Sequence, residues 1–205
     1  ALSGAALHST GLAKTGTGAL TVANAVVSES RADVALAAGA TDLADLRGTF
    51  GRVAFADGAG DELARLGTAG FLSLSGGLAF GAGREAEVAA AQGAEMRLFG
   101  ALAAPAGTTL RKTGAGTVVV SADGPEFRGR LVVEAGIFSI TNGNLMNMTA
   151  TAADPVRVRA DGMLRVRADA VGYKYRLPKG AVVDVDGGVA HISGNNPFYR
   201  TLMDG

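Results

Sequence analysis

The sequence predicts an all-β chain of 205 residues that folds as a single β-solenoid, a stack of coils made of short parallel strands. Three observations lead to this fold class. A glycine followed by alternating apolar residues recurs along the chain, the apolar positions hold small and interchangeable side chains, and the turns between strands lack the signal of a tight hairpin.

The recurrent unit is a glycine followed by a short strand in which every second residue is apolar. Successive side chains of a strand point to opposite faces, so Leu72 and Leu74 are predicted to face the core. Phe71 and Ser73 are then predicted to face outward. The glycine supplies the positive φ, or the close backbone approach, that a sharp corner needs. The unit occupies residues 18–22, 70–74, 76–80, 116–120, 136–140 and 162–166.

Short strands with glycine corners also occur in β-sandwiches and β-barrels. A sandwich core usually needs several large interlocking side chains, whereas this chain has no Trp and only 5% aromatic residues. The Asn142-Gly143 pair lies in a polar stretch and does not join two obvious strands. The solenoid is therefore favoured, with a core expected to consist of Val, Leu and Ala.

A longer string, Leu-x-Lys-Thr-Gly-x-Gly, begins at Leu12 and again at Leu110. Each copy continues into an alternating strand, so the two segments are predicted to be equivalent structural units. In the second copy, the alternation predicts that Val120 points inward and Val119 points outward.

Composition excludes several classes of function. Lys plus Arg and Asp plus Glu are both 19, so the formal net charge is zero and no long-range field would gather nucleic acid. The absence of Cys excludes disulfides, thiol catalysis and Cys-based zinc sites, and suits a protein that crosses an oxidising compartment. No run of about 18 apolar residues, the length needed to span a bilayer, is present.

The stretch KTGAGTVVVSADGPEFRGRLVVEAGIFSI covers residues 112–140 and places an aromatic residue at Phe127 and a glycine at Gly129, between two alternating strands. This order resembles the passenger-associated repeat of bacterial autotransporters. Residues 72–110 are similar to the segment that often precedes that repeat, and KTGTGALTV at 14–22 is a second, shorter copy. The resemblance implies a right-handed parallel β-helix that is extracellular or on the cell surface of a Gram-negative-type bacterium.

Residues 85–98, EAEVAAAQGAEMRL, have a composition that also suits a short surface helix. The resemblance instead implies strands in this segment. Strands are therefore the prediction for this part of the chain.

The two ends of a solenoid differ from its interior coils, because an open end exposes unpaired backbone groups and the edge of the core. We expect the solenoid to cover residues 1–194. Residues 195–205 depart from the repeat and are expected to form a C-terminal cap folded over the last coil or a docking segment for the first coil of another molecule. The candidate self-association residues are Phe198, Tyr199, Leu202 and Met203.

Four arginines form the most organised polar feature, because Val-Arg-Val-Arg at 156–159 is followed by Leu-Arg-Val-Arg at 164–167. If the apolar residues face inward, the guanidinium groups share the outer face and form a candidate polyanion contact, for example with an acidic surface polysaccharide. The alternative is a solvated face whose charge is balanced by Asp154, Asp161 and Asp169. The four arginines are Arg157, Arg159, Arg165 and Arg167.

No catalytic, cofactor-binding or metal-binding residues are predicted. Lys-Thr-Gly accompanies Ser-x-x-Lys in serine β-lactamases, but Ser-x-x-Lys is absent here, and the Gly-x-Gly corners lack the further residues of a nucleotide-binding loop. Asp184 and Asp186 could offer carboxylates to Ca²⁺, although Asp-Gly is a common turn pair. His8 and His191 lie far apart in sequence, without a nucleophile motif nearby.

Three classes of function remain open. The first is a non-enzymatic structural solenoid of the cell surface, which associates end to end with itself into a fibre or stacks on neighbouring coils of a longer chain. The second is an autotransporter passenger adhesin that binds a host or polysaccharide ligand. The third is a polysaccharide-cleaving β-helix enzyme, which would need clustered carboxylates beside a groove. The first is the prediction, for either a passenger fragment or a subunit anchored by another route.

Overall fold

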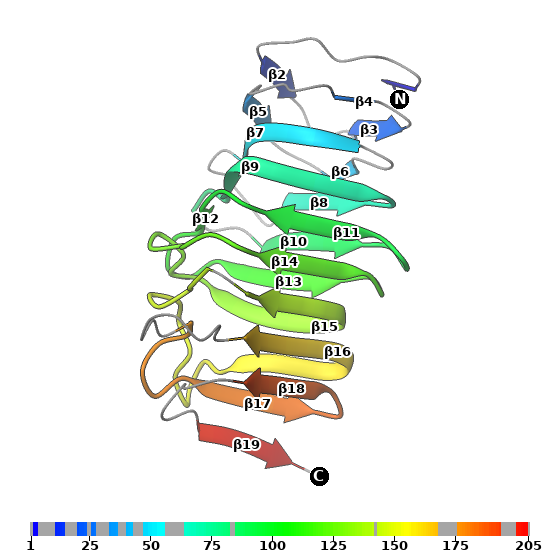
Figure 1. Ribbon diagram of the computed structural model, residues 1–205. Helices are drawn as coiled ribbons and strands as arrows, with labels where there is room; N and C mark the ends of the chain where they lie inside the picture. Colours follow the sequence, from blue (N-terminus) through cyan, green and yellow to red (C-terminus); the bar gives the residue numbers. More distant parts are fainter. Residues whose placement is uncertain are drawn as a thin grey trace.

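The computed structural model of the chain describes residues 2–3, 11–14, 20–23, 26–27, 33–36, 40–42, 47–55, 64–82, 85–141, 143–167, 176–193 and 200–204. Side chains are described for 53–55, 65–82, 85–141, 143–167 and 176–193. All of the regular structure in these ranges is β-strand, and the strands are stacked one above another from the N-terminal to the C-terminal end (Figure 1). The predicted all-β solenoid of parallel strands is confirmed.

The first nine strands are β1 (Leu2–Ser3), β2 (Gly11–Lys14), β3 (Leu20–Ala23), β4 (Val26–Val27), β5 (Asp33–Leu36), β6 (Ala40–Asp42), β7 (Arg47–Phe55), β8 (Ala64–Thr68) and β9 (Phe71–Ala79). The next ten are β10 (Glu85–Ala90), β11 (Glu95–Leu98), β12 (Leu102–Ala103), β13 (Thr109–Thr113), β14 (Thr117–Val120), β15 (Arg130–Ile140), β16 (Val156–Arg167), β17 (Val182–Asp186), β18 (Val189–Ser193) and β19 (Arg200–Asp204).

Parallel pairing between successive coils arranges these strands in three sheets. Sheet 1 contains β1, β3, β6, β8, β10, β13, the first halves of β15 and β16, β17 and β19. Sheet 2 contains β4, the first halves of β7 and β9, β11, β14, the second halves of β15 and β16, and β18. Sheet 3 contains β2, β5, the second halves of β7 and β9, and β12.

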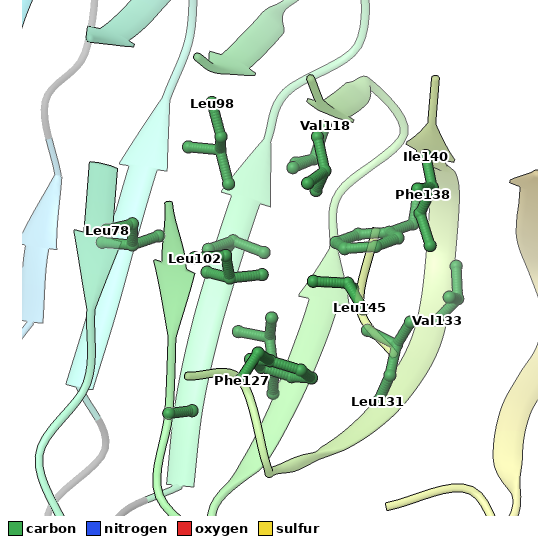
Figure 2. Packing of buried hydrophobic residues seen from close by; sticks show 14 of the residues in the cluster. Leu78, Leu98, Leu102, Val118, Phe127, Leu131, Val133, Phe138, Ile140 and Leu145 are labelled. Atoms are coloured by element: carbon green, nitrogen blue, oxygen red, sulfur yellow. The ribbon is translucent and has the colours of Figure 1, made fainter. Parts of the chain in front are cut away.

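The core lies inside the coils and is built from columns of apolar side chains that stack like on like. One column of sheet 2 contains Leu74, Leu98, Val120, Ile140 and Val166, which occupy matching register positions and are all 0% exposed. Figure 2 shows how Leu98, Val118 and Ile140 point into the interior with residues of the other walls. Full burial of each such side chain contributes about 1.5–3 kcal/mol.

The core is less uniform than the composition suggested, because it also contains large aromatic side chains. Phe127 and Phe138 are 0% exposed and lie among the aliphatic residues of Figure 2. Phe55 and Phe80 stack on each other with ring centroids 5.2 Å apart. The expectation of a core of Val, Leu and Ala alone was wrong, since wide coils leave room that only larger rings fill.

Residues 85–98 form β10 and β11 joined by a turn, so the prediction of strands rather than a helix is confirmed. Their inward residues include Val88, Met96 and Leu98, each 0% exposed. Burial of alternate residues against neighbouring coils therefore overrides the helix-forming composition of this segment.

The two Lys-Thr-Gly copies do not occupy equivalent positions, so that prediction was wrong. Leu12 lies in sheet 3, in the column that continues through Val34 and Val53. Leu110 lies in sheet 1, between Ala86 and Leu131. In each copy a strand ends at the Lys-Thr step, at Lys14 in β2 and at Thr113 in β13, although the two strands belong to different sheets.

The alternation of burial along β14 gives a direct test of the register. Val120→Asp should lower the free energy of unfolding by about 4 kcal/mol, because it places an unpaired carboxylate in the core. Val119→Asp should cost about 1 kcal/mol or less, because Val119 is outward and partly exposed. Urea denaturation of both variants measures the difference. Equal effects of the two substitutions would contradict this register.

Candidate functional site

The lysine of the second Lys-Thr-Gly copy is buried. Lys112 takes an inward register position between Val88 and Val133 and is 0% exposed. Its Nζ donates hydrogen bonds to the carbonyl oxygens of Thr113 (2.7 Å), Gly114 (2.7 Å) and Ala135 (2.9 Å). Burial lowers the pKa of Lys112 to about 8, so the group is still an ammonium at neutral pH. The ammonium group therefore links two corners by hydrogen bonds, because Thr113 and Gly114 lie in its own coil and Ala135 lies in the next.

Gly114 of this motif, and Gly136 at the matching corner of the next coil, are required by the close stacking of the corners. Gly114 and Gly136 have φ values of 71° and 68°, in the left-handed region that favours glycine. A Cβ on Gly136 would lie 2.4 Å from the carbonyl oxygens of both Gly114 and Gly116. The motif is thus explained by a structural role of its lysine and glycines at one corner of the solenoid.

The four predicted arginines all point outward, because the alternate residues Val156, Val158, Leu164 and Val166 are each 0% exposed. They do not share one face, so that part of the prediction was wrong. β16 turns a corner between its two halves, which pair with β17 and β18 respectively. Arg157 and Arg159 therefore lie on the outer surface of sheet 1, while Arg165 and Arg167 lie on the outer surface of sheet 2.

The outer surface of sheet 1 carries its own counter-charges. Arg157 Nε lies 4.0 Å from Asp184 Oδ2, and Arg159 Nη1 lies 2.6 Å from Asp186 Oδ2. Further pairs across neighbouring coils are Arg65 with Glu87, Arg111 with Glu85 and Glu134, and Arg130 with Asp154. Each exposed pair is worth about 0–1 kcal/mol, but together they leave few positive charges free for an external anion.

The acids that balance this surface differ from those expected. Asp154 pairs with Arg130 across neighbouring coils. Asp169 lies outside the described residues. Asp184 and Asp186, which could have offered carboxylates to Ca²⁺, bind arginines instead. Among the described residues, no group of three or more His, Cys, Asp or Glu could hold a metal ion.

The outer surface of sheet 2 carries a hollow of about 410 Å³, which we call the sheet-2 groove. Its floor holds small hydroxyl residues and its edges hold arginines. Neither Arg165 nor Arg167 forms an ion pair within the described part of the chain; Arg165 Nη2 instead donates to Met163 Sδ at 3.7 Å. The groove is lined by Glu95, Arg97, Phe99, Thr117, Val119, Ser121, Ser139, Thr141, Arg165 and Arg167.

The sequence pattern did not single out this groove, since its residues come from four separate coils. Their common signal is a small polar residue at the outward position of a strand, as at Ser139. Ser139 alternates with the inward residues Phe138 and Ile140, and yet it is only 3% exposed. A buried serine on an outer surface indicates a depression.

The residues predicted for self-association are only partly described. Phe198 and Tyr199 lie outside the described residues. Leu202 and Met203 belong to β19, where they pair in register with Asp184 and Val185 of β17. Of the two histidines, His191 is exposed on β18, and His8 lies outside the described residues.

No protein-family model, curated protein or solved structure matches the chain. The likeness to the autotransporter passenger repeat therefore rests on the sequence strings quoted above. Within the described ranges, no helix has the length and hydropathy needed to cross a membrane.

The contribution of the buried ammonium can be measured with a matched pair of variants. Lys112→Met keeps the size of the side chain but removes the donor to three carbonyl oxygens, and should lower the free energy of unfolding by about 2 kcal/mol. Arg111→Met, on the exposed side of the same strand, should cost less than about 1 kcal/mol. Thermal and urea denaturation compare the two. A larger cost for the Arg111 variant would overturn the role assigned to Lys112.

A pH titration tests the same site through linkage. The ordinary pKa of the amine is 10.5 and burial lowers it to about 8, so between these values the unfolded chain holds a proton that the folded chain lacks. The stability of the wild type should therefore rise, relative to Lys112→Met, as the pH increases through this window. Urea denaturation at about pH 7, 8.5 and 10 measures this. A constant difference would show that the three carbonyls hold the pKa near its ordinary value.

Proposed function

We propose that this protein is a non-enzymatic structural element of the bacterial cell surface, a rod that associates end to end into a fibre or continues a longer surface rod. The observation that carries the proposal is the parallel ladder that runs from β1 through β19 (Figure 1). Such a ladder can be extended coil by coil, which makes a solenoid a suitable building unit for an elongated structure.

The state of the two ends supports this role. Among the described strands, β19 pairs with β17 on one side and with none on the other, and β2 pairs only with β5. An unpaired strand edge offers a row of N–H and C=O groups to another strand. The edge of β19 is therefore the docking surface in this proposal, and its occupant is the N-terminal coil of a second copy or a further coil of the same rod. Contact between opposite ends does not close on itself and gives a filament.

The location outside the cell is supported by two features of the sequence. The chain has no Cys, so it cannot form disulfides while it crosses an oxidising compartment. Its repeat strings resemble those of autotransporter passengers. The carboxylates that a polysaccharide-cleaving enzyme would use on sheet 1 are bonded to arginines, which favours a structural role over catalysis.

Electron microscopy over a concentration series, with light scattering alongside, tests end-to-end association. Filaments of uniform width should form and lengthen as concentration rises. Met203→Lys should abolish them, because Met203 pairs in register with Val185, in the column of the buried Val158, and a charge in that column blocks stacking of another coil. Leu202→Lys, at the register position of Asp184, should leave the filaments intact.

Circular dichroism would establish that both variants keep the β-solenoid. Short monodisperse rods of the wild type at every concentration would contradict self-association of this chain. Equal loss of filaments in the two lysine variants would contradict the assignment of the column of Val158 and Val185 as the contact.

A further inference from the structure

The sheet-2 groove has the layout of a binding site, with a hydroxyl floor between two charged walls. In register, Arg97, Val119, Ser139 and Arg165 follow one another on successive coils. Parallel strands lie about 4.8 Å apart, so the two arginines are about 14 Å apart along the solenoid axis. A linear ligand that lies along the axis would cross the floor between Arg97 on β11 and the arginines of β16.

The charge of the groove is not satisfied by its own residues. Arg97 is paired with Glu95 and lies over the Phe71 ring, 5.5 Å from its centroid. Arg165 and Arg167 have no carboxylate partner within the described residues. The sheet-1 hollow, of about 300 Å³, contrasts with this, because each of its four arginines forms an ion pair.

The floor also presents an unused hydroxyl group. Ser139 is 3% exposed, and no described residue forms a hydrogen bond with its side chain. It lines the hollow beside Ser121 and Thr141, whose hydroxyl oxygens are 3.3 Å apart. The Ser139 oxygen is not one of the fully enclosed, unpartnered side-chain atoms of the described residues, so it reaches the hollow, where a ligand hydroxyl can replace water as its partner.

The exposed ring of Phe99 completes the groove. Phe99 is 50% exposed and follows Leu98 at the end of β11, where Ser121 N donates to Leu98 O at 2.9 Å. A ring that size left open beside polar side chains can stack on the apolar face of a sugar. Stacking, hydroxyl contacts and paired guanidinium groups are together the contacts that a charged carbohydrate needs.

We propose that the sheet-2 groove binds a linear acidic polysaccharide that bears uronate groups and lies along the solenoid axis. The carboxylates bind Arg165 and Arg167 in the fork geometry that guanidinium groups favour, and the sugar hydroxyls bind Ser139 and its neighbours. An acidic peptide is a poorer fit, since the strands of sheet 2 around the groove are paired on both sides and offer no edge to its backbone. This site does not depend on end-to-end association, because it lies on a side of the rod.

Isothermal titration with an alginate-derived oligouronate, at low and at raised salt, tests the proposal on the full chain. The wild type should bind the oligouronate, with affinity that falls as salt rises, and should not bind a neutral malto-oligosaccharide. The double variant Arg165→Gln, Arg167→Gln should lose about tenfold or more in affinity. The matched double variant Arg157→Gln, Arg159→Gln, with its substitutions on sheet 1, should stay within about twofold of the wild type.

A second variant keeps all charges and removes only the floor hydroxyl. Ser139→Ala should weaken binding by about fivefold, whereas binding by charge alone would leave it unchanged. No binding by the wild type, or equal losses in the two arginine double variants, would overturn the site. If polyglutamate binds the same arginines as tightly as the oligouronate does, the assignment of a polysaccharide ligand is overturned and the groove is assigned to an acidic peptide.

Discussion

The backbone hydrogen bonding between successive coils is the constraint on which the rest of this structure depends. Each strand finds its partners in the coils before and after it, so every strand in the interior of the stack is satisfied only when its neighbours are in place. This fixes which side chains lie above one another. Apolar residues then stack in columns inside the coil, and the outward positions are free to vary. Function is therefore to be sought on the outer surfaces and at the ends, where the ladder leaves groups unused.

The sequence could predict the features that depend on residues adjacent in the chain, such as which side chains of a strand face the core. Alternation along a single strand placed Val120 inward and Val119 outward, and the burial of β14 agrees. The sequence could not show on which sheet a strand lies, because that depends on pairing with residues about a coil away. Strings with the same alternation therefore lie on different sheets, as in the two halves of β16. The sheet-2 groove could not be predicted from the sequence for the same reason, because its residues come from separate coils and meet only when the coils stack.

The zero net charge of the chain conceals an uneven distribution over its surfaces. On sheet 1, arginines form ion pairs with carboxylates of neighbouring coils and the charges neutralise one another. On sheet 2, the arginines of β16 line the groove with hydroxyl residues, and no carboxylate in the described ranges forms an ion pair with them. At physiological salt, fields fade within about 8 Å, so each surface acts by its local charge and the two can have different partners.

Repetition exposes a solenoid to threading errors, because coils that look alike can stack in the wrong order. Columns of interchangeable valines and leucines do little to prevent this. Lys112 reduces the degeneracy, because two of its carbonyl acceptors, on Thr113 and Gly114, lie in its own coil and the third, on Ala135, lies in the next coil. A misplaced coil would remove the Ala135 acceptor and leave the buried ammonium one hydrogen bond short, at a cost of about 1–3 kcal/mol. One polar residue in an otherwise apolar column thus makes one order of stacking more stable than the alternatives, and so specifies which coils are neighbours.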